Sequence, residues 1–299
     1  MSLILDGKIV RDHVAHELEK FIKTFPSKPT LAIIQVGNLE ESDAYIKQKE
    51  LFAVRIGAKV RHIKVDAKVE PRQFFENISN LNTDPEVNGV IIQLPLPEGL
   101  PPEMFVEAID PAKDVDGLTA VNLKALYGKK DGFVPATALG ILSLLRYYKV
   151  SIEGKKITVV GRSMLVGKPT ALVFINENAT VTVAHSKTER LEECTKEADI
   201  LIVAIGVPKF INDTHVIPGQ IVVDVGINII ETGTKLNEEI TGRKLVGDVD
   251  FEKVKNIIGS ISPVPGGVGP MTVATLFQNL VKAYAQQNKI ALPAEVSNI

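Results

Sequence analysis

The stretch KITVVGRSMLVGKP, residues 156–169, decides how this chain folds. Its apolar part, Ile157 to Val160, indicates a strand, Gly161 begins a turn, and the residues from Pro169 to Asn176 indicate a helix. In an open parallel sheet, a dinucleotide binds at the carboxyl end of such a strand, and the following helix offers free N–H groups to its pyrophosphate. The spacing matches neither G-x-G-x-x-G nor the P-loop. A turn whose glycines serve backbone geometry alone therefore stays open as an alternative.

The next expected strand, residues 180–184, bears on which dinucleotide would bind. It runs into the polar segment HSKT, residues 185–188, and no carboxylate occurs before Glu189. An NAD site usually has a carboxylate here to hold the ribose 2′-hydroxyl. Arg162 in the neighbouring turn would attract a 2′-phosphate, and Ser186 would donate a hydrogen bond to it. These residues favour NADP, and an ordinary polar strand end is the alternative.

Strand and helix signals alternate through most of the chain, which predicts crossover connections, mainly parallel sheets and an α/β class. The length of 299 residues suggests two domains. Gly57 should end the helix expected over 40–56, in which Tyr45, Leu51, Phe52 and Ile56 are the candidate inward positions. The strands are expected at 31–36, 60–65, 87–94, 156–160, 180–184, 200–205 and 221–225, and the helices at 40–56, 71–81, 102–109, 137–148, 169–176, 191–196 and 270–286.

The composition excludes several classes of protein. Hydrophobic residues make up 45% and charged residues 23%, which are globular proportions, and the net charge of −2 gives no footprint for nucleic acid. A single cysteine, Cys194, excludes an intrachain disulfide and fits a reducing compartment. Residues 1–10 do not form a secretory signal, and no apolar run has the length of a membrane span. We therefore expect a cytoplasmic protein without a membrane or nucleic-acid partner.

Chemically active side chains concentrate in the first half. Tyr45 and Lys49 lie four residues apart on one expected helix, so they share a face, and desolvation would lower the pKa of the lysine. Gln93 ends an apolar strand. Asp114 and Asp116 flank a valine in KDVDG, residues 113–117, without a His or Cys cluster that would suggest a metal. For Tyr45 and Lys49, the alternative to a pair that handles protons is an aromatic residue beside a surface lysine. For Asp114 and Asp116, the alternative to a ligand-binding role is an ordinary Asp-Gly turn.

The segment SPVPGGVGPMT, residues 262–272, holds three prolines and three glycines within the nine residues from Ser262 to Pro270. The prolines restrict the backbone of such a loop, and its glycines let backbone approach a ligand closely. It ends where a helix is expected to start. The segment is therefore a candidate ligand-binding loop.

Taken in order, these pieces resemble the bifunctional methylenetetrahydrofolate dehydrogenase/methenyltetrahydrofolate cyclohydrolase family over nearly the whole chain. The matching motifs are S-x-x-Y-I-x-x-K (42–49), QLPLP (93–97), KDVDG (113–117), GRS-x-x-VGKP (161–169), ATVT (179–182), HSKT (185–188), VDVGIN (223–228), GDV (247–249) and PVPGGVGP (263–270). The chain departs from the family at PATALG (135–140), where the usual cysteine and second proline are absent.

The resemblance implies an N-terminal catalytic, folate-binding α/β domain, residues 1–138, rejoined by the C-terminal helix, residues 271–299. A Rossmann-like NADP domain, residues 139–270, would lie between them in sequence. It further implies a homodimer that acts on tetrahydrofolate one-carbon derivatives without a metal. Its implied site residues are Lys49, Tyr45 and Gln93 for catalysis; Ser42, Asp116, Pro265, Gly266 and Gly267 for the substrate; and Thr137, Gly161, Arg162, Ser163, Val166, Gly167, Ser186, Gly206, Gly226 and Ile227 for the cofactor.

Three other functions remain as alternatives. The first is a monofunctional NADP-dependent dehydrogenase, against which Tyr45, Lys49 and Gln93 argue. The second is an NADP-dependent enzyme for another substrate, against which Asp116 and the 263–270 loop argue. The third is a nonenzymatic nucleotide-sensing module, which the presence of Lys49 disfavours.

Overall fold

A computed structural model describes residues 2–231 and 243–293 of the chain. The chain divides into two compact units, each built from two separate parts of the sequence. We call them the six-stranded unit, Met1–Arg11 with Thr137–Thr272, and the three-stranded unit, Asp12–Ala136 with Val273–Ile299. The expected division assigned the first eleven residues to the other unit. They belong with the six-stranded unit because β1 pairs with β11.

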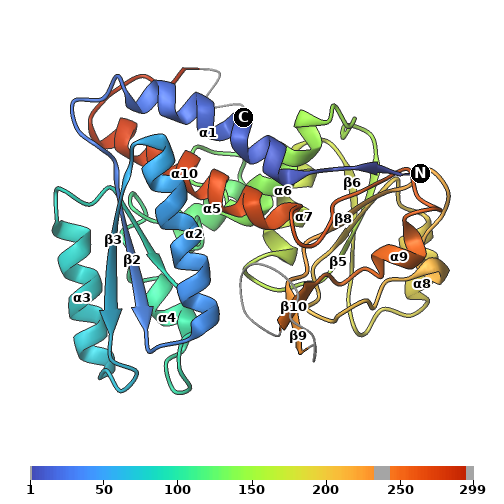
Figure 1. Cartoon of the computed structure of the whole chain (residues 1–299), viewed down its shortest axis with the longest axis horizontal. Coiled ribbons are helices and arrows are strands. Elements are labelled where there is room, and N and C mark those ends of the chain that lie inside the picture. Colours follow the sequence, from blue (N-terminus) through green and yellow to red (C-terminus); the bar gives the residue numbers. More distant parts are fainter. Residues whose placement is uncertain (1, 232–242, 294–299) are drawn as a thin grey trace. The chain divides into compact units, whose positions relative to one another are not determined.

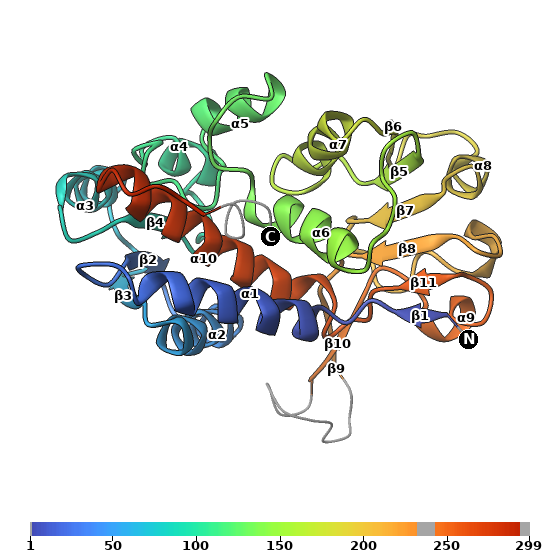
Figure 2. The same cartoon turned by 90° about the horizontal axis from the view of Figure 1, so that it is seen from above.

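The six-stranded unit is built on a wholly parallel sheet with the strand order β1-β11-β8-β7-β5-β6. Its strands are β1 (Leu3–Ile4), β5 (Lys156–Val160), β6 (Thr180–Ala184), β7 (Ile200–Val203), β8 (Ile221–Asp224) and β11 (Ser260–Ile261). A separate antiparallel ribbon pairs β9 (Asn228–Glu231) with β10 (Arg243–Val246). Its helical segments are α7 (Gly167–Asn176), α8 (Leu191–Lys196), the 3-10 turn η1 (Asp213–His215) and α9 (Phe251–Val254), with most of α6 (Ala136–Tyr147) (Figures 1 and 2).

The three-stranded unit has a parallel sheet in the order β3-β2-β4. Its strands are β2 (Thr30–Val36), β3 (Lys59–Val65) and β4 (Gly89–Ile92). Its helices are α2 (Glu40–Ile56), α3 (Pro71–Thr83), α4 (Pro102–Val106) and α5 (Ala120–Tyr127). Most of α1 (Gly7–Ile22) and the larger part of α10 (Val268–Gln287) also belong to this unit.

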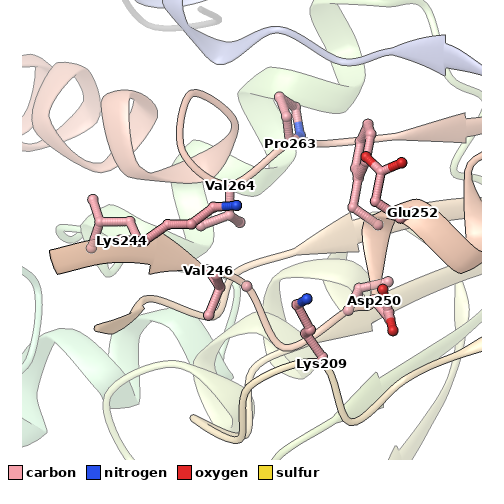
Figure 3. A pocket seen from close by; sticks show the side chains of 11 residues that line it. Lys209, Lys244, Val246, Asp250, Glu252, Pro263 and Val264 are labelled. Atoms are coloured by element: carbon pink, nitrogen blue, oxygen red, sulfur yellow. The ribbon is translucent and has the colours of Figure 1, made fainter. Parts of the chain in front are cut away.

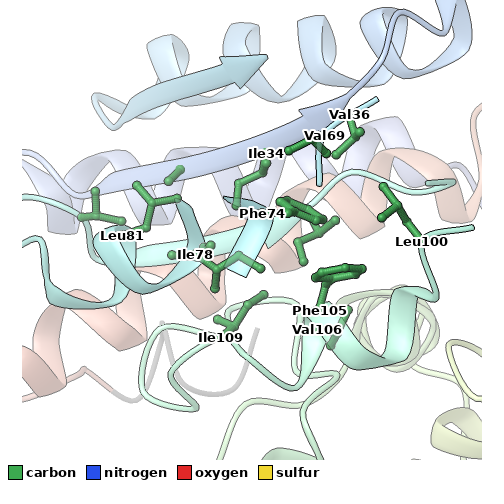
Figure 4. Close-up of a cluster of buried hydrophobic side chains, with 14 residues drawn as sticks. Ile34, Val36, Val69, Phe74, Ile78, Leu81, Leu100, Phe105, Val106 and Ile109 are labelled. Carbon is green, nitrogen blue, oxygen red and sulfur yellow. The ribbon is translucent and has the colours of Figure 1, made fainter. Parts of the chain in front are cut away.

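One core cluster of the three-stranded unit lies between the sheet and helices α3 and α4 (Figure 4). Alternate residues of β2 point into it, as the period of a strand requires. Phe74 and Phe105 contact each other there, with ring centroids 4.5 Å apart. The intervening β2 residues face the other way, and Gln35 among them reaches Asp43 on α2. Helix α2, which carries Tyr45 and Lys49, therefore lies on the opposite face of the sheet from this core cluster.

The expected strands and helices are all present, with ends shifted by a few residues, and Gly57 ends α2 in the left-handed conformation. Phe52 and Ile56 are buried as expected. The inward placement of Leu51 was wrong, because its side chain is 53% exposed. The elements that were not predicted are helices α1, α5 and α9, the turn η1, the short strands β1 and β11 and the β9–β10 ribbon. No helix of the described residues is long and apolar enough to cross a membrane.

Candidate functional site

Lys49 forms the chemical centre of the three-stranded unit. It lies on α2 and is half-buried, and its Nζ donates a 2.7 Å hydrogen bond to Oε1 of Gln93. The amide nitrogen of Gln93 donates to the carbonyl oxygen of Leu94 at 2.9 Å. This second bond fixes the orientation of the amide, because its oxygen must then face the lysine. The hydrogen-bond acceptor that fixes the Lys49 ammonium is thus the uncharged amide oxygen of Gln93.

The parallel sheet and the helical period bring these residues together. Gln93 follows β4, and its backbone N–H donates to Ile34 of the adjacent strand β2. Ser42, Tyr45 and Lys49 are spaced three and four residues apart on α2, so they lie on one helical face. Ser42 is buried and Tyr45 half-buried. The catalytic residues expected from the sequence, Lys49, Tyr45 and Gln93, therefore lie in one unit on neighbouring elements.

The KDVDG segment separates two carboxylates with different tasks. Asp114 is buried and accepts hydrogen bonds from the N–H groups of Gly117 and Thr119, at 3.0 and 2.8 Å, and from the amide of Asn122 at 2.9 Å. Asp116, two residues later, is half-buried, and its carboxylate accepts no hydrogen bond from the rest of the described chain. Asp114 is therefore committed to the turn, whereas the carboxylate oxygens of Asp116 have no such structural use within the described chain.

Lys113 completes this segment as a structural residue. Its buried ammonium donates to the carbonyl oxygens of Leu81 and Asp84, at 3.0 and 2.7 Å, at the end of α3. A cation at a helix C-terminus satisfies carbonyl groups that have no partner within the helix. Lys113 therefore anchors the segment that carries Asp116.

Lys49 and Asp116 perturb each other's ionisation. Burial lowers the pKa of Lys49 to about 8, while the negative charge of Asp116 acts in the opposite direction. Burial raises the pKa of Asp116 to about 6, opposed by the charge of Lys49 and reinforced by Asp114. Desolvation disfavours the charged form of both groups. Two groups that titrate on either side of neutral pH can hold and move protons at one place.

Gly161 and Gly167 shape the candidate nucleotide loop. Gly161 has φ +133°, and a side chain there would overlap the carbonyl oxygen of Ala204. A side chain on Gly167 would overlap Gly161 itself. Ser163 Oγ accepts 3.2 Å bonds from the N–H groups of Val166 and Gly167, where α7 begins. The loop is thus a close-packed backbone turn ending at a helix N-terminus, and it leaves the hydroxyl hydrogen of Ser163 available.

Arg162 and Ser186 follow strand ends that pair in register. Val160 of β5 pairs with Ala184 of β6, and each polar residue comes two positions after its strand's end. Both side chains are exposed. The carboxyl ends of parallel strands share one edge of a sheet, so Arg162 and Ser186 lie at the same edge. Their placement suits a phosphate on a ribose at this edge.

The remaining expected cofactor residues belong to the same unit. Gly206 follows β7 with φ +69°, and Gly226 and Ile227 follow β8. Gly226 is buried, whereas Ile227 is exposed. Thr137, in the first turn of α6, accepts a 3.3 Å hydrogen bond from the hydroxyl of Thr272.

The loop with the expected substrate residues Pro265, Gly266 and Gly267 is held from within its own unit. The carbonyl of Gly266 accepts a 2.8 Å bond from Gly7, and the N–H of Gly267 donates to Pro263 at 2.7 Å. These two backbone groups are therefore already used, and Pro265 is the exposed member of the three.

A cavity of about 200 Å³ adjoins the first residues of this loop. The sequence did not indicate this cavity. Pro263 and Val264 line it together with Val246 and Lys244 of β10 and with Lys209 (Figure 3). It belongs wholly to the six-stranded unit. No group of three or more metal-ligating side chains gathers anywhere in the described residues.

The fold and site thus define a two-unit α/β protein with a Rossmann-like parallel sheet and a separate lysine-centred chemical centre. Two family profiles match: the tetrahydrofolate dehydrogenase/cyclohydrolase catalytic domain over residues 5–116, and the NAD(P)-binding domain of the same name over residues 135–288. The chain belongs to the tetrahydrofolate dehydrogenase/cyclohydrolase family.

Full-length relatives support this assignment. The bifunctional protein FolD of Acholeplasma laidlawii is 43% identical, over 96% of this chain and all of its own length. The FolD structure from Campylobacter jejuni has a TM-score of 0.88 at 37% identity and covers 96% of this chain and 99% of its own. The FolD structure from Trypanosoma brucei, complexed with NADP and an inhibitor, has a TM-score of 0.90 at 30% identity, with the same two coverages.

The different tasks of Asp114 and Asp116 predict opposite effects on stability. Asp114→Ala removes an acceptor from three buried donors and leaves the N–H of Thr119 without another acceptor in the described chain, so it should lower the free energy of unfolding by on the order of 2 kcal/mol. The folded-state pKa of Asp116 is raised, so its contribution to stability is lost as the pH rises through about 6. Asp116→Ala should therefore leave stability at neutral pH unchanged or slightly higher. Urea unfolding of both variants tests this, and equal losses would contradict it.

Proposed function

We propose that the chain oxidises 5,10-methylenetetrahydrofolate to 5,10-methenyltetrahydrofolate with NADP and then hydrolyses the product to 10-formyltetrahydrofolate. The observation that carries the proposal is Lys49, bonded to Gln93 and electrostatically coupled to Asp116. The bifunctional names of full-length relatives at about 40% identity support both activities. The chain's partners would therefore be tetrahydrofolate one-carbon derivatives.

The residues of the six-stranded unit fit NADP. The turn at Gly161 and Gly167 excludes side chains, and the N-terminus of α7 offers N–H groups to a pyrophosphate. Arg162 and Ser186 would hold the 2′-phosphate, and no carboxylate occurs between β6 and Glu189 to repel it. The chemistry that NADP supplies when bound is acceptance of a hydride from the methylene carbon of the folate. The relative from Trypanosoma brucei was solved with NADP.

Lys49 is proposed to act in the hydrolytic half. Water adds to the methenyl carbon, the bond from that carbon to N5 breaks, and the net reaction releases one proton. A neutral Lys49 accepts the proton of the attacking water while Gln93 fixes the position of its Nζ. With a pKa of about 8, roughly a tenth of Lys49 is neutral at pH 7. At the ordinary lysine pKa that fraction would be roughly three hundred times smaller.

Asp116 and Tyr45 are proposed to position the folate around Lys49. The carboxylate oxygens of Asp116 accept no hydrogen bond within the described chain and would accept hydrogen bonds from the N–H groups of the pterin ring. Tyr45 precedes Lys49 by one helical turn and would assist in handling protons. Ser42 on the same face would contact the substrate.

A monofunctional dehydrogenase is the second candidate. It would need the NADP residues but not a lysine with a lowered pKa, so the Lys49–Gln93 bond argues against it. We further propose a homodimer, as the resemblance to the family implies, and a cytoplasmic location. Sedimentation of the purified chain measures the oligomeric state.

The direct test of the function is to incubate the protein with methylenetetrahydrofolate and either NADP or NAD. Reduced cofactor and the methenyl compound are followed by absorbance. We expect reduction of NADP with little accumulation of the methenyl compound. Steady accumulation of the methenyl compound would support the monofunctional candidate, and absence of any reduction would contradict the proposed function.

Lys49→Met should reduce hydrolysis of added methenyltetrahydrofolate by about 10²- to 10⁴-fold, because the variant has no group to accept the proton of water. The matched control is Lys47→Met on the same helix, where the lysine is exposed and lies 4.0 Å from Glu50. The control should retain wild-type hydrolysis. Hydrolysis at the wild-type rate in Lys49→Met would remove this residue from the mechanism.

Arg162→Ala should lower kcat/KM for NADP by about 10- to 150-fold, mainly through KM, because a charge-assisted contact with the 2′-phosphate is lost. The value for NAD should change much less, since NAD lacks that phosphate. The comparison needs specificity constants for both cofactors in the wild type and the variant. Equal losses for the two cofactors would mean that Arg162 is structural or contacts the pyrophosphate.

A further inference from the structure

Two aspartates that have no assigned role themselves are buried near the carboxyl edge of the six-stranded sheet. Asp224 ends β8 and is 3% exposed, and Asp248 follows β10 and is 0% exposed. Neither forms an ion pair within the part of the chain that the structure describes. Buried carboxylates need compensating donors, so their hydrogen bonds reveal what they hold in place.

Asp248 joins the loops after two neighbouring strands. Its Oδ2 accepts the N–H groups of Ile205 and Gly206, at 2.7 and 2.9 Å, in the loop that follows β7. Its Oδ1 accepts the side-chain amide of Asn228 at 2.8 Å, immediately after the loop of Gly226 and Ile227 that follows β8. One carboxylate thus fixes both loops at once.

Asp224 fixes the backbone around Asp248 through its own hydrogen bonds. Its Oδ1 accepts the N–H groups of Gly226 and Asp248, and its Oδ2 accepts that of Val249, each at 3.0 Å. Burial raises the pKa of Asp224 to about 7, against the effect of these donors. A side chain on Gly226 would overlap the carboxylate of Asp248, and one on Gly247 would overlap that of Asp224. The glycines of both motifs therefore make room for the carboxylates.

The strand order indicates which half of the dinucleotide these loops would face. Across the sheet the strands lie in the spatial order β6-β5-β7-β8. The proposed 2′-phosphate residues follow β6 and β5, and the proposed pyrophosphate turn follows β5. A dinucleotide bound across the carboxyl edge continues in the same direction. The loops after β7 and β8 are therefore left for its nicotinamide half.

We propose that Asp248 is a positioning residue for the nicotinamide half of the cofactor, acting through the loops at Gly206 and Gly226–Ile227. It needs no contact with the cofactor. The proposal rests on the proposed dehydrogenase function. A carboxylate suits this role because both of its oxygens are acceptors, and three N–H donors from two loops converge on them.

The principal variant is Asp248→Ala, assayed as the full chain in the dehydrogenase reaction. We expect kcat/KM to fall roughly 10- to 100-fold, and by the same factor for NADP and NAD, because both carry the same nicotinamide half. Arg162→Ala, by contrast, should discriminate between the two cofactors. Asp248→Asn retains one acceptor oxygen and should fall between the wild type and the alanine variant, and it serves as the test if the alanine variant does not fold.

Two further measurements separate positioning from general damage. Adenosine 2′,5′-bisphosphate carries only the half of the cofactor assigned to β5 and β6, so its dissociation constant should change by less than about twofold. Hydrolysis of added methenyltetrahydrofolate, assayed without NADP, depends on Lys49 of the other unit and should be retained. Asp250→Asn is the matched control, since Asp250 lies two residues away and pairs with Lys253 at 3.7 Å.

The outcomes distinguish the two proposals. No reduction of NADP by the wild type would contradict the proposed function itself. Wild-type activity with unchanged kcat/KM in both Asp248 variants would overturn the positioning role. Parallel weakening of adenosine 2′,5′-bisphosphate binding would also overturn it, because Asp248 would then stabilise the whole nucleotide unit. Loss confined to NADP would place Asp248 with the 2′-phosphate instead.

Discussion

Partial burial of the Lys49 ammonium group is the constraint around which the three-stranded unit is arranged. Removing an ammonium from water is costly unless acceptors replace the water, and here one amide oxygen and one nearby carboxylate do so. The compensation is incomplete, so the pKa of Lys49 falls to about 8. Stronger pairing would hold the lysine charged, and deeper burial without a partner would hold it neutral. The incomplete balance leaves it able to exchange protons near neutral pH.

Keeping this balance requires rigid surroundings, which the backbone of the same unit provides. Lys113 anchors one end of the KDVDG segment to the end of α3, and Asp114 closes its turn through three hydrogen bonds. Only Asp116 is left to face Lys49. The six-stranded unit follows a similar principle, because Asp224 and Asp248 organise its loops while Arg162 and Ser186 stay exposed. In both units, buried charged groups hold loops and turns in place through hydrogen bonds.

Much of this arrangement could be predicted from the sequence, because strand alternation and helix spacing are local signals. The Tyr45–Lys49 face and the turn at Gly161 follow from such signals. Helix α1 was missed although Val10, Val14, Leu18 and Ile22 recur every four residues and are all buried. The inward placement of Leu51 failed because spacing does not say how wide the buried face of a helix is. Asp114 takes the turn role that the sequence had offered as an alternative, since its partners are local. The role of Asp248 could not be predicted, since its partners come from segments that only tertiary structure brings near.

The central claim is that Lys49 titrates close to neutral pH because of its surroundings, and nuclear magnetic resonance can measure this directly. Protein labelled with ¹³C at the lysine Cε positions is titrated with pH, and Lys49 is assigned by its absence in Lys49→Met. The account predicts a pKa of about 8 in the wild type. It predicts a lower value in Asp116→Asn, because the neighbouring negative charge that favours the ammonium form is gone. A pKa near 10.5 in the wild type, or a rise in the variant, would contradict it.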